Sequence, residues 1–71
     1  MIYLLYEKYY DEYGDFCACN VYPYRLYEGV VQRLVDETGK TTAQVEDELS
    51  SGDGIVKSGN WEYSVEETEV L

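Results

Sequence analysis

The sequence predicts an α+β domain, in which a small antiparallel sheet of three or four strands, in the order ββααβ, packs against one amphipathic helix and a second short helix. Two observations predict this fold class. Residues 2–10 and 61–70 are rich in β-branched and aromatic side chains, as strands are. Between them, residues 26–35 place apolar side chains at helical spacing. Because 71 residues can bury only one core, we expect a single domain over residues 1–71.

The first half of the chain predicts a β-hairpin. Residues 2–10 form its first strand, the polar residues 11–15 form the turn, and residues 16–22 form the second strand. We expect Pro23 to end this strand and the amphipathic helix to begin soon after it. Both faces of the first strand are apolar, which suits a strand covered by a helix on one face and by a partner or tyrosine rings on the other. The faces comprise Ile2, Leu4 and Tyr6 on one side and Tyr3, Leu5 and Tyr9 on the other.

Cys17 and Cys19 lie in the second predicted strand and are separated by one residue. That spacing is too short for an unstrained disulfide within the chain. A zinc site needs about four ligands, and the sequence has neither a His nor a third Cys. We therefore expect no metal site, and we expect both cysteines to be small core residues on the more buried face of their strand.

The second half of the chain predicts two helices and a return to the sheet. The apolar side chains of residues 26–35 share one half of the helical wheel, and Gly29 among them indicates close packing or a contact that needs no side chain. Residues 38–39 predict the helix end, and a Thr-x-x-Gln capping box at residues 41–44 predicts the start of the second helix. Residues 55–57 are a candidate fourth strand. One face of the last strand comprises Trp61, Tyr63 and Val65.

The net charge of −10 excludes some classes of binding partner. Direct binding to nucleic acid is not expected, because phosphates repel so acidic a chain. A content of 45 % hydrophobic residues indicates a folded protein and not a disordered one. No stretch approaches the roughly 20 apolar residues of a membrane span, and residues 1–5 are too short an apolar run for a signal peptide. We therefore expect a cytoplasmic protein that does not bind membranes.

No motif in the sequence predicts catalysis or cofactor binding. Gly39, Lys40 and Thr41 look like the end of a phosphate-binding loop, but that motif requires a glycine where this chain has Leu34. Acid–base catalysis needs two carboxylates in different environments within a pocket, and the sequence marks no such pair. We therefore predict a protein that is not an enzyme and has no catalytic residue and no cofactor.

Acidic and tyrosine side chains form the predicted binding surface. Carboxylates two residues apart on a strand lie roughly 6–7 Å apart, a spacing comparable to the charge spacing of about 3.4 Å along a DNA strand. A rigid row of carboxylates can therefore occupy the basic groove of a nucleic-acid-binding protein, while tyrosine rings supply contact area. In the alternative interpretation, the carboxylates only keep the protein soluble and the tyrosines are ordinary strand formers. The predicted partner-binding residues are Asp11, Glu12, Tyr13, Asp15, Glu62, Glu66, Glu67 and Glu69.

The segments IYLLYE at residues 2–7 and YDEYG at residues 10–14, followed by an apolar strand and an amphipathic helix, resemble a family of very short phage and prophage proteins of unknown function. The resemblance covers mostly residues 1–35. In that family a longer polar turn often joins the second strand to the helix, whereas Pro23 makes the junction abrupt here. The resemblance implies a phage setting, in which small acidic proteins often inhibit host defence, as anti-CRISPR proteins and DNA mimics do. It carries no catalytic residue to any position of this chain.

Two functions are consistent with these features. We expect a phage-type inhibitor that binds and blocks a basic nucleic-acid-handling or defence protein in the host cytoplasm, with carboxylates steering association and tyrosine rings anchoring the complex. The alternative is a non-catalytic structural or regulatory module that forms a homodimer or binds a phage component. In that case the first strand, apolar on both faces and placed at a sheet edge, pairs with its counterpart across a two-fold axis.

Overall fold

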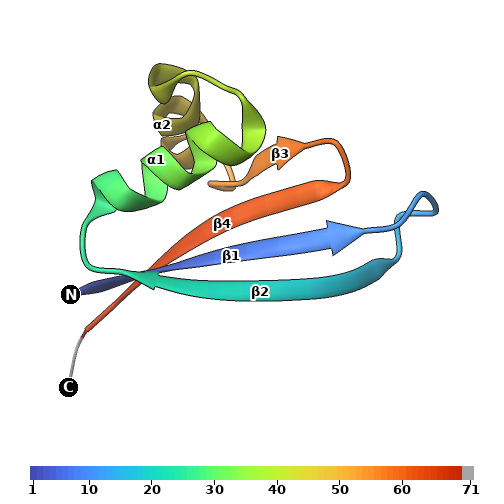
Figure 1. The fold of residues 1–71 in the computed structure, drawn as a ribbon, viewed down its shortest axis with the longest axis horizontal. Helices are drawn as coiled ribbons and strands as arrows, with labels where there is room; N and C mark the ends of the chain where they lie inside the picture. The colour runs from blue at the N-terminus through green and yellow to red at the C-terminus, as the bar shows by residue number, and fades with distance from the viewer. Residues whose placement is uncertain (70–71) are drawn as a thin grey trace.

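A computed structural model describes residues 1–69 and consists of a four-stranded antiparallel sheet and two helices (Figure 1). The strand order is β2-β1-β4-β3, and both helices lie on the same side of the sheet. The predicted fold class, including the fourth short strand and the second short helix, is confirmed. Val70, which the sequence placed at the end of the last strand, lies outside the described residues. The elements are β1 (Ile2–Tyr10), β2 (Phe16–Tyr24), α1 (Tyr27–Thr38), α2 (Thr42–Ser50), β3 (Val56–Ser58) and β4 (Trp61–Thr68).

Asp11 closes the hairpin that joins β1 to β2. Its Oδ1 accepts hydrogen bonds from the backbone N–H groups of Tyr13 and Asp15, both at 2.9 Å, as short acidic side chains do in turns. Gly14 adopts a φ of 82°, a left-handed conformation that glycine takes without steric strain. The chain therefore reverses direction at residues 11–15, where the sequence predicts the turn.

The end of α1 and the start of α2 lie where the sequence predicts them. Gly39 ends α1 with a φ of 73°, and its N–H donates to the carbonyl oxygen of Val35 at 3.0 Å. Two reciprocal hydrogen bonds start α2. Thr41 Oγ1 accepts from the Gln44 N–H at 3.2 Å, and Gln44 Oε1 accepts from the Thr41 N–H at 2.9 Å. These bonds satisfy backbone groups that helix termini leave unpaired, so the short connection between the helices is well defined.

The core lies between the helices and one face of the sheet. Successive strand residues alternate between the two faces, and the register places Leu5 of β1, Tyr63 of β4 and Val56 of β3 on the face beneath the helices. They meet Leu34 of α1, whose side chain is fully buried. The buried hydrophobic residues are Leu5, Val30, Val31, Leu34, Val45, Val56 and Tyr63.

Gly29 lets α1 approach the sheet closely. A Cβ atom at this position would stand 3.0 Å from Cδ1 of the Tyr24 ring, nearer than the optimum of about 3.5–4.0 Å between nonbonded carbon atoms. The ring of Tyr24, at the end of β2, therefore lies directly against the helix backbone. Of the two reasons that the sequence suggests for this glycine, close packing is the one observed.

A partly buried ion pair that sequence analysis did not identify connects α1 to the sheet. Glu7 lies on the helix-covered face of β1 and is only 4 % exposed, and its Oε2 accepts a hydrogen bond from Arg33 Nε at 3.2 Å. Arg33 Nε also lies 3.2 Å from Glu37, and the guanidinium carbon lies 4.4 Å from the centre of the Tyr22 ring. Burial lowers the pKa of Arg33, but the hydrogen bond and the charge of Glu7 outweigh this effect and raise it. A buried carboxylate requires such a partner, so the pair fixes α1 above β1 and β2.

β2 continues to Tyr24, so the prediction that Pro23 ends this strand at Tyr22 is wrong. Pro23 is the register partner of Leu4 in β1. Proline lacks a backbone N–H, and the sheet tolerates it here because β2 is an edge strand, with no partner strand on its outer side among residues 1–69. The helix consequently starts only at Tyr27.

β1 is an interior strand, so the expectation that the first strand lies at a sheet edge is wrong. It lies between β2 and β4, and Leu5, for example, is aligned with Tyr22 on one side and with Val65 on the other. Beside β1, β4 adds Tyr63 to the core that Leu5 forms with the helices. Within the described residues, the edges of the sheet are β2 and the three-residue β3.

Cys17 and Cys19 are exposed, which corrects the prediction that they are core residues. They belong to the half of β2 next to the hairpin turn, whereas the helices lie toward the other end of the hairpin (Figure 1). Cys19 is aligned with Lys8, which neighbours the buried Glu7 and therefore points away from the helices. Small side chains need a second layer to be buried, and none reaches this corner among residues 1–69.

Replacing Leu34 with Ala should lower the free energy of unfolding by about 2–5 kcal/mol, because it leaves a cavity in the centre of the core. Urea denaturation followed by circular dichroism measures the change. Leu26→Ala is the matched control. The sequence placed Leu26 on the apolar stripe, but this residue precedes α1 and is 66 % exposed, so its replacement should have little effect. Equal losses in the two variants would contradict the core described here.

Stability should fall above pH 10 partly because of Tyr63. Burial raises the pKa of this phenol above its ordinary value of about 10, and the charges of Glu37 and Glu7 raise it further. Between the unfolded and the folded pKa, the unfolded chain has lost the proton that the folded protein keeps, so the contribution of Tyr63 is complete below pH 10 and is lost as the pH rises through the folded pKa. Tyr63→Phe should therefore show a shallower loss of unfolding free energy above pH 10 than Tyr13→Phe, which removes a phenol from the exposed hairpin tip. Identical pH profiles of the two variants would refute this.

Candidate protein-binding surface

The sheet face opposite the helices has no covering layer among residues 1–69. Leu5 and Glu7 are buried under the helices, so their neighbours Leu4 and Tyr6 point to the other face. On the edge strand, Val21 is 48 % exposed. Exposed apolar side chains that adjoin one another on one face are typical of protein-binding surfaces. The apolar members of this open face are Leu4, Tyr6, Tyr10, Phe16, Cys19 and Val21.

Two of the predicted binding residues, Glu62 and Glu66, lie on β4 on this open face. Glu66 accepts a hydrogen bond from the Tyr6 hydroxyl at 2.9 Å, and this bond is the main reason that the pKa of Tyr6 is raised. Glu62 lies 3.7 Å from Lys57 and is aligned with Lys8 of β1. Residues four apart on a strand are separated by roughly 13 Å. The open face therefore carries two carboxylates at a defined spacing beside its apolar strip.

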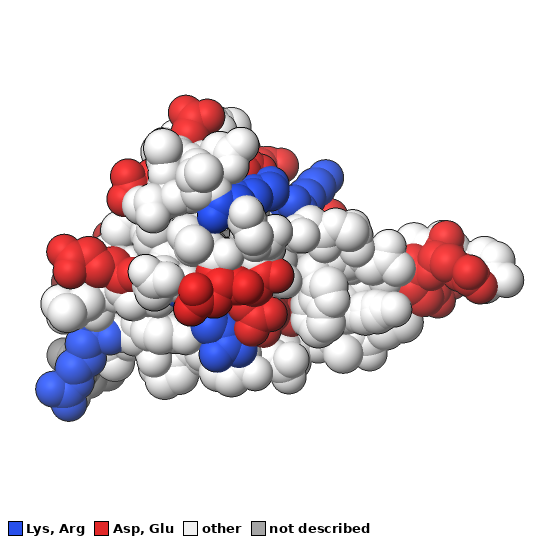
Figure 2. Space-filling view, turned by 45° about the horizontal axis from the view of Figure 1, so that its top comes forward, with Lys and Arg blue, Asp and Glu red and all other residues white. Residues whose placement is uncertain are grey.

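The hairpin tip brings most of the other predicted residues together. Figure 2 shows Asp and Glu side chains gathered at the extremity of the molecule that corresponds to the hairpin. Tyr13 at this tip is 82 % exposed, as expected for a recognition residue. Asp11 differs from its neighbours because its carboxylate is already used to close the turn. A hollow of about 390 Å³ lies between the tip and the β3–β4 turn, and Asp11, Glu12, Lys57, Trp61 and Glu62 are among its lining residues.

The eight predicted residues form two groups and not one surface. Five of them lie at one end of the molecule, which is 38 Å long. They are Asp11, Glu12, Tyr13 and Asp15 of the hairpin tip, and Glu62 of β4. Glu66, Glu67 and Glu69 lie at the other end, at and beyond the end of β4. Glu66 and Glu67 are neighbours in the chain and point to opposite faces of the sheet. A partner that contacts both groups must therefore span the length of the sheet.

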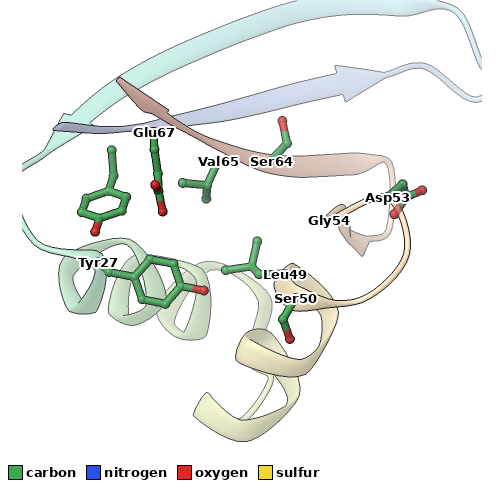
Figure 3. Close-up of a pocket in the computed structure, with 9 residues that line it drawn as sticks. Tyr27, Leu49, Ser50, Asp53, Gly54, Ser64, Val65 and Glu67 are labelled. Atoms are coloured by element: carbon green, nitrogen blue, oxygen red, sulfur yellow. The ribbon is translucent and has the colours of Figure 1, made fainter. Parts of the chain in front are cut away.

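Glu67 lines a second hollow, of about 560 Å³, between β4 and the helices (Figure 3). Tyr27 of α1 lies on one side of it, and the Tyr3 ring packs edge-to-face against Tyr27 with ring centroids 5.6 Å apart. Burial raises the pKa of Tyr27, and the nearby charges of Glu46 and Glu67 raise it further. Sequence reasoning missed this hollow. Tyr3 and Tyr27 are 24 positions apart in the chain, and only the fold brings them together.

A row of aromatic rings runs along the helix side of the sheet from Tyr63 in the core toward the hairpin turn. Tyr9 stacks on Trp61 with ring centroids 5.1 Å apart, and Trp61 is followed by Tyr63 at 6.3 Å. The shared face of Trp61, Tyr63 and Val65 that the sequence predicts is confirmed, since Val65 and Tyr63 are aligned with Leu5 and Glu7 of β1. The stacked rings of Tyr9 and Trp61 bury apolar area against each other, without a helix above them among residues 1–69. They therefore stabilise the sheet next to the hairpin turn.

Comparisons with protein-family models, with curated proteins and with solved structures found no match to this chain. Neither helix within residues 1–69 is long and apolar enough to cross a membrane. In the same residues, His, Cys, Asp and Glu side chains do not form a group of three or more that could hold a metal ion.

Proposed function

We propose that this protein is a phage-type inhibitor that binds and blocks a host nucleic-acid-handling or defence protein, in the manner of a DNA mimic or an anti-CRISPR protein. The proposal rests on the hairpin tip, which lies at one extremity of the molecule and is rich in carboxylates (Figure 2). Tyr13 at this tip is 82 % exposed and lies in the chain between Glu12 and Asp15. Tyrosine is enriched in protein interfaces because it supplies a large contact area with few rotatable bonds. A basic protein surface complements the carboxylates around it.

The charge distribution supports a partner that normally binds nucleic acid. The chain has a net charge of −10, and a field of one sign accelerates encounter with a surface of the opposite sign. On the open face, the roughly 13 Å between Glu62 and Glu66 corresponds to the rise of about four phosphates along one DNA strand. The apolar strip beside them supplies contact area that DNA itself lacks, so the complex can outlast one held by charge alone.

Capture from a bacterial lysate, with DNA as competitor, tests the proposal. The immobilised chain should retain proteins that bind nucleic acid, and a double-stranded DNA fragment should release them, because both ligands occupy the same basic groove. A variant with Glu12→Gln, Asp15→Asn, Glu62→Gln and Glu66→Gln is the control and should retain much less of them. Retained proteins that do not bind nucleic acid, or that DNA fails to release, would contradict the proposal.

Charge and ring contacts at the hairpin tip should have separable kinetic effects on a captured partner. Glu12→Lys with Asp15→Lys should lower the association rate about tenfold at low salt, because long-range steering is lost. Tyr13→Ala, in the same turn, should instead raise the dissociation rate about fivefold to thirtyfold, since ring burial acts only on contact. Surface plasmon resonance at two salt concentrations measures both rates. An unchanged association rate in the lysine variant would indicate that the carboxylates serve only solubility.

A second candidate function, a structural or regulatory module that forms a homodimer, is favoured by the character of β2. This edge strand is nine residues long and carries no charged side chain, whereas edge strands usually carry Lys or are very short, as β3 is. Two chains that each bear a net charge of −10 can approach along β2 without bringing carboxylates into contact. Antiparallel pairing of β2 with its counterpart across a two-fold axis would extend the sheet from one chain into the next.

Light scattering over a range of concentrations tests homodimer formation. If β2 pairs with its counterpart, the mass should rise from 8.2 kDa toward twice that value. Cys19→Lys with Val21→Lys should keep the chain at the lower mass, because like charges on adjacent strands repel. The matched control, Thr42→Lys with Ala43→Lys at the exposed start of α2, should still associate. A mass of 8.2 kDa at every concentration of the unmodified chain would exclude this candidate.

A further inference from the structure

The hollow between β4 and the helices has aromatic and apolar walls. The rings of Tyr3 and Tyr27 meet edge-to-face with an interplanar angle of 62°, and Leu49 and Val65 add aliphatic surface. Figure 3 shows the side chain of Glu67 pointing from β4 toward the helices, on the same side of the sheet as Tyr27. A volume of about 560 Å³ admits a long side chain of another protein. The space is therefore large enough for a ligand and combines rings with a carboxylate.

The charge of the hollow indicates the kind of ligand. Its lining residues include two acidic residues, Asp53 and Glu67, and, within residues 1–69, no Lys or Arg. Asp53 Oδ1 accepts a hydrogen bond from the Ile55 N–H at 3.1 Å, so Glu67 is the carboxylate left for a ligand. Besides burial, the charges of Glu46 and Glu67 act on the Tyr27 phenol and hold its pKa above the ordinary value. A cation over a tyrosine ring is attracted by the electrons of the ring, and carboxylates add to this attraction. The hollow therefore suits a cation and disfavours an anion.

The same combination of groups already holds an arginine elsewhere in this chain. The guanidinium of Arg33 lies 4.4 Å from the centre of the Tyr22 ring, and its Nε lies 3.2 Å from both Glu7 and Glu37. On this sheet, a tyrosine ring and adjacent carboxylates thus surround a guanidinium that α1 itself carries. Tyr27 and Glu67 offer the same two kinds of group, with room beside them.

We propose that this hollow binds an arginine side chain of the partner protein, with the guanidinium between the tyrosine rings and the Glu67 carboxylate. Arginine fits better than lysine, because its planar guanidinium can stack on a ring and form two parallel hydrogen bonds to a carboxylate. The proposal rests on the proposed function, since proteins that handle nucleic acid present arginines that normally contact phosphates. It assigns one such arginine to Glu67, at the end of the molecule opposite the hairpin tip.

An NMR titration of the full chain with N-acetyl-arginine amide tests the site. A single contact of this kind is weak, so the probe is added to high millimolar concentration at constant ionic strength. Shift changes should concentrate at the residues that line the hollow, such as Tyr27, Val65 and Glu67. N-acetyl-citrulline amide, which has nearly the same shape and no charge, should leave these signals in place.

The chain offers a matched pair of variants for this titration. Glu67→Gln should raise the apparent dissociation constant for the arginine probe about fivefold, because it removes the charge at the hollow. Glu66→Gln makes the same change one residue earlier, on the other face of the sheet, where the carboxylate accepts from Tyr6. This second variant should bind the probe as the unmodified chain does.

Three results would overturn the proposed site: equal shifts from the arginine and citrulline probes, equal weakening by the two variants, or shifts centred on the hairpin tip. The site and the proposed function can also fail separately. If Glu67→Gln weakens the binding of the arginine probe but the chain captures no nucleic-acid-binding protein, the proposed function is wrong and the proposed site stands. If such a protein is captured equally by the unmodified chain and by Glu67→Gln, the assignment of its arginine to the hollow is wrong and the function stands.

Discussion

The packing of a single helical layer against one face of the sheet is the constraint on which the rest of this structure depends. Leu34 of α1 meets Leu5 and Tyr63 of the sheet, and with the valines around them these side chains make up the core. Within residues 1–69 there is no further element to cover the opposite face or the hairpin beyond the helices. Apolar side chains such as Val21 are therefore exposed as a result of the architecture, and the candidate binding surface is the part of the sheet that the helices do not cover.

Most of the positive charges lie next to carboxylates of the same chain. Among residues 1–69, three of the five Lys and Arg residues form ion pairs. Arg33 joins α1 to β1, Lys40 in the connection between the helices pairs with Glu48 of α2 at 2.7 Å, and Lys57 lies near Glu62. The exposed pair of Lys57 and Glu62 adds little stability, but all three pairs neutralise positive charge that would otherwise offset the carboxylates. Both ends of the molecule consequently expose carboxylates, and the hollow beside Tyr27 is acidic for the same reason.

Local signals in the sequence predict most of the fold and only part of the site. The capping box at residues 41–44 and the turn at residues 11–15 depend on neighbouring residues alone, so they could be identified. Whether Cys19 is buried depends on which face of the hairpin the helices cover, and that is decided by the packing of α1 on β1, which are distant in sequence. The exposed tip around Tyr13 was predictable from its composition. The hollow was not, because Tyr3 and Tyr27 come together only when β1 and α1 pack.

The close contact at Gly29 has a consequence for how α1 can move. The Tyr24 ring lies against the helix backbone at this glycine, and one turn later Arg33 reaches down to Glu7. A helix held at two points along its length cannot turn about its own axis without losing one of the contacts. The outer face of α1, which includes Gln32 and its hydrogen-bond partner Asp36 at 3.0 Å, therefore keeps one orientation relative to the sheet. A molecule that approaches α1 would therefore always meet the same face of the helix, because the helix does not rotate about its own axis.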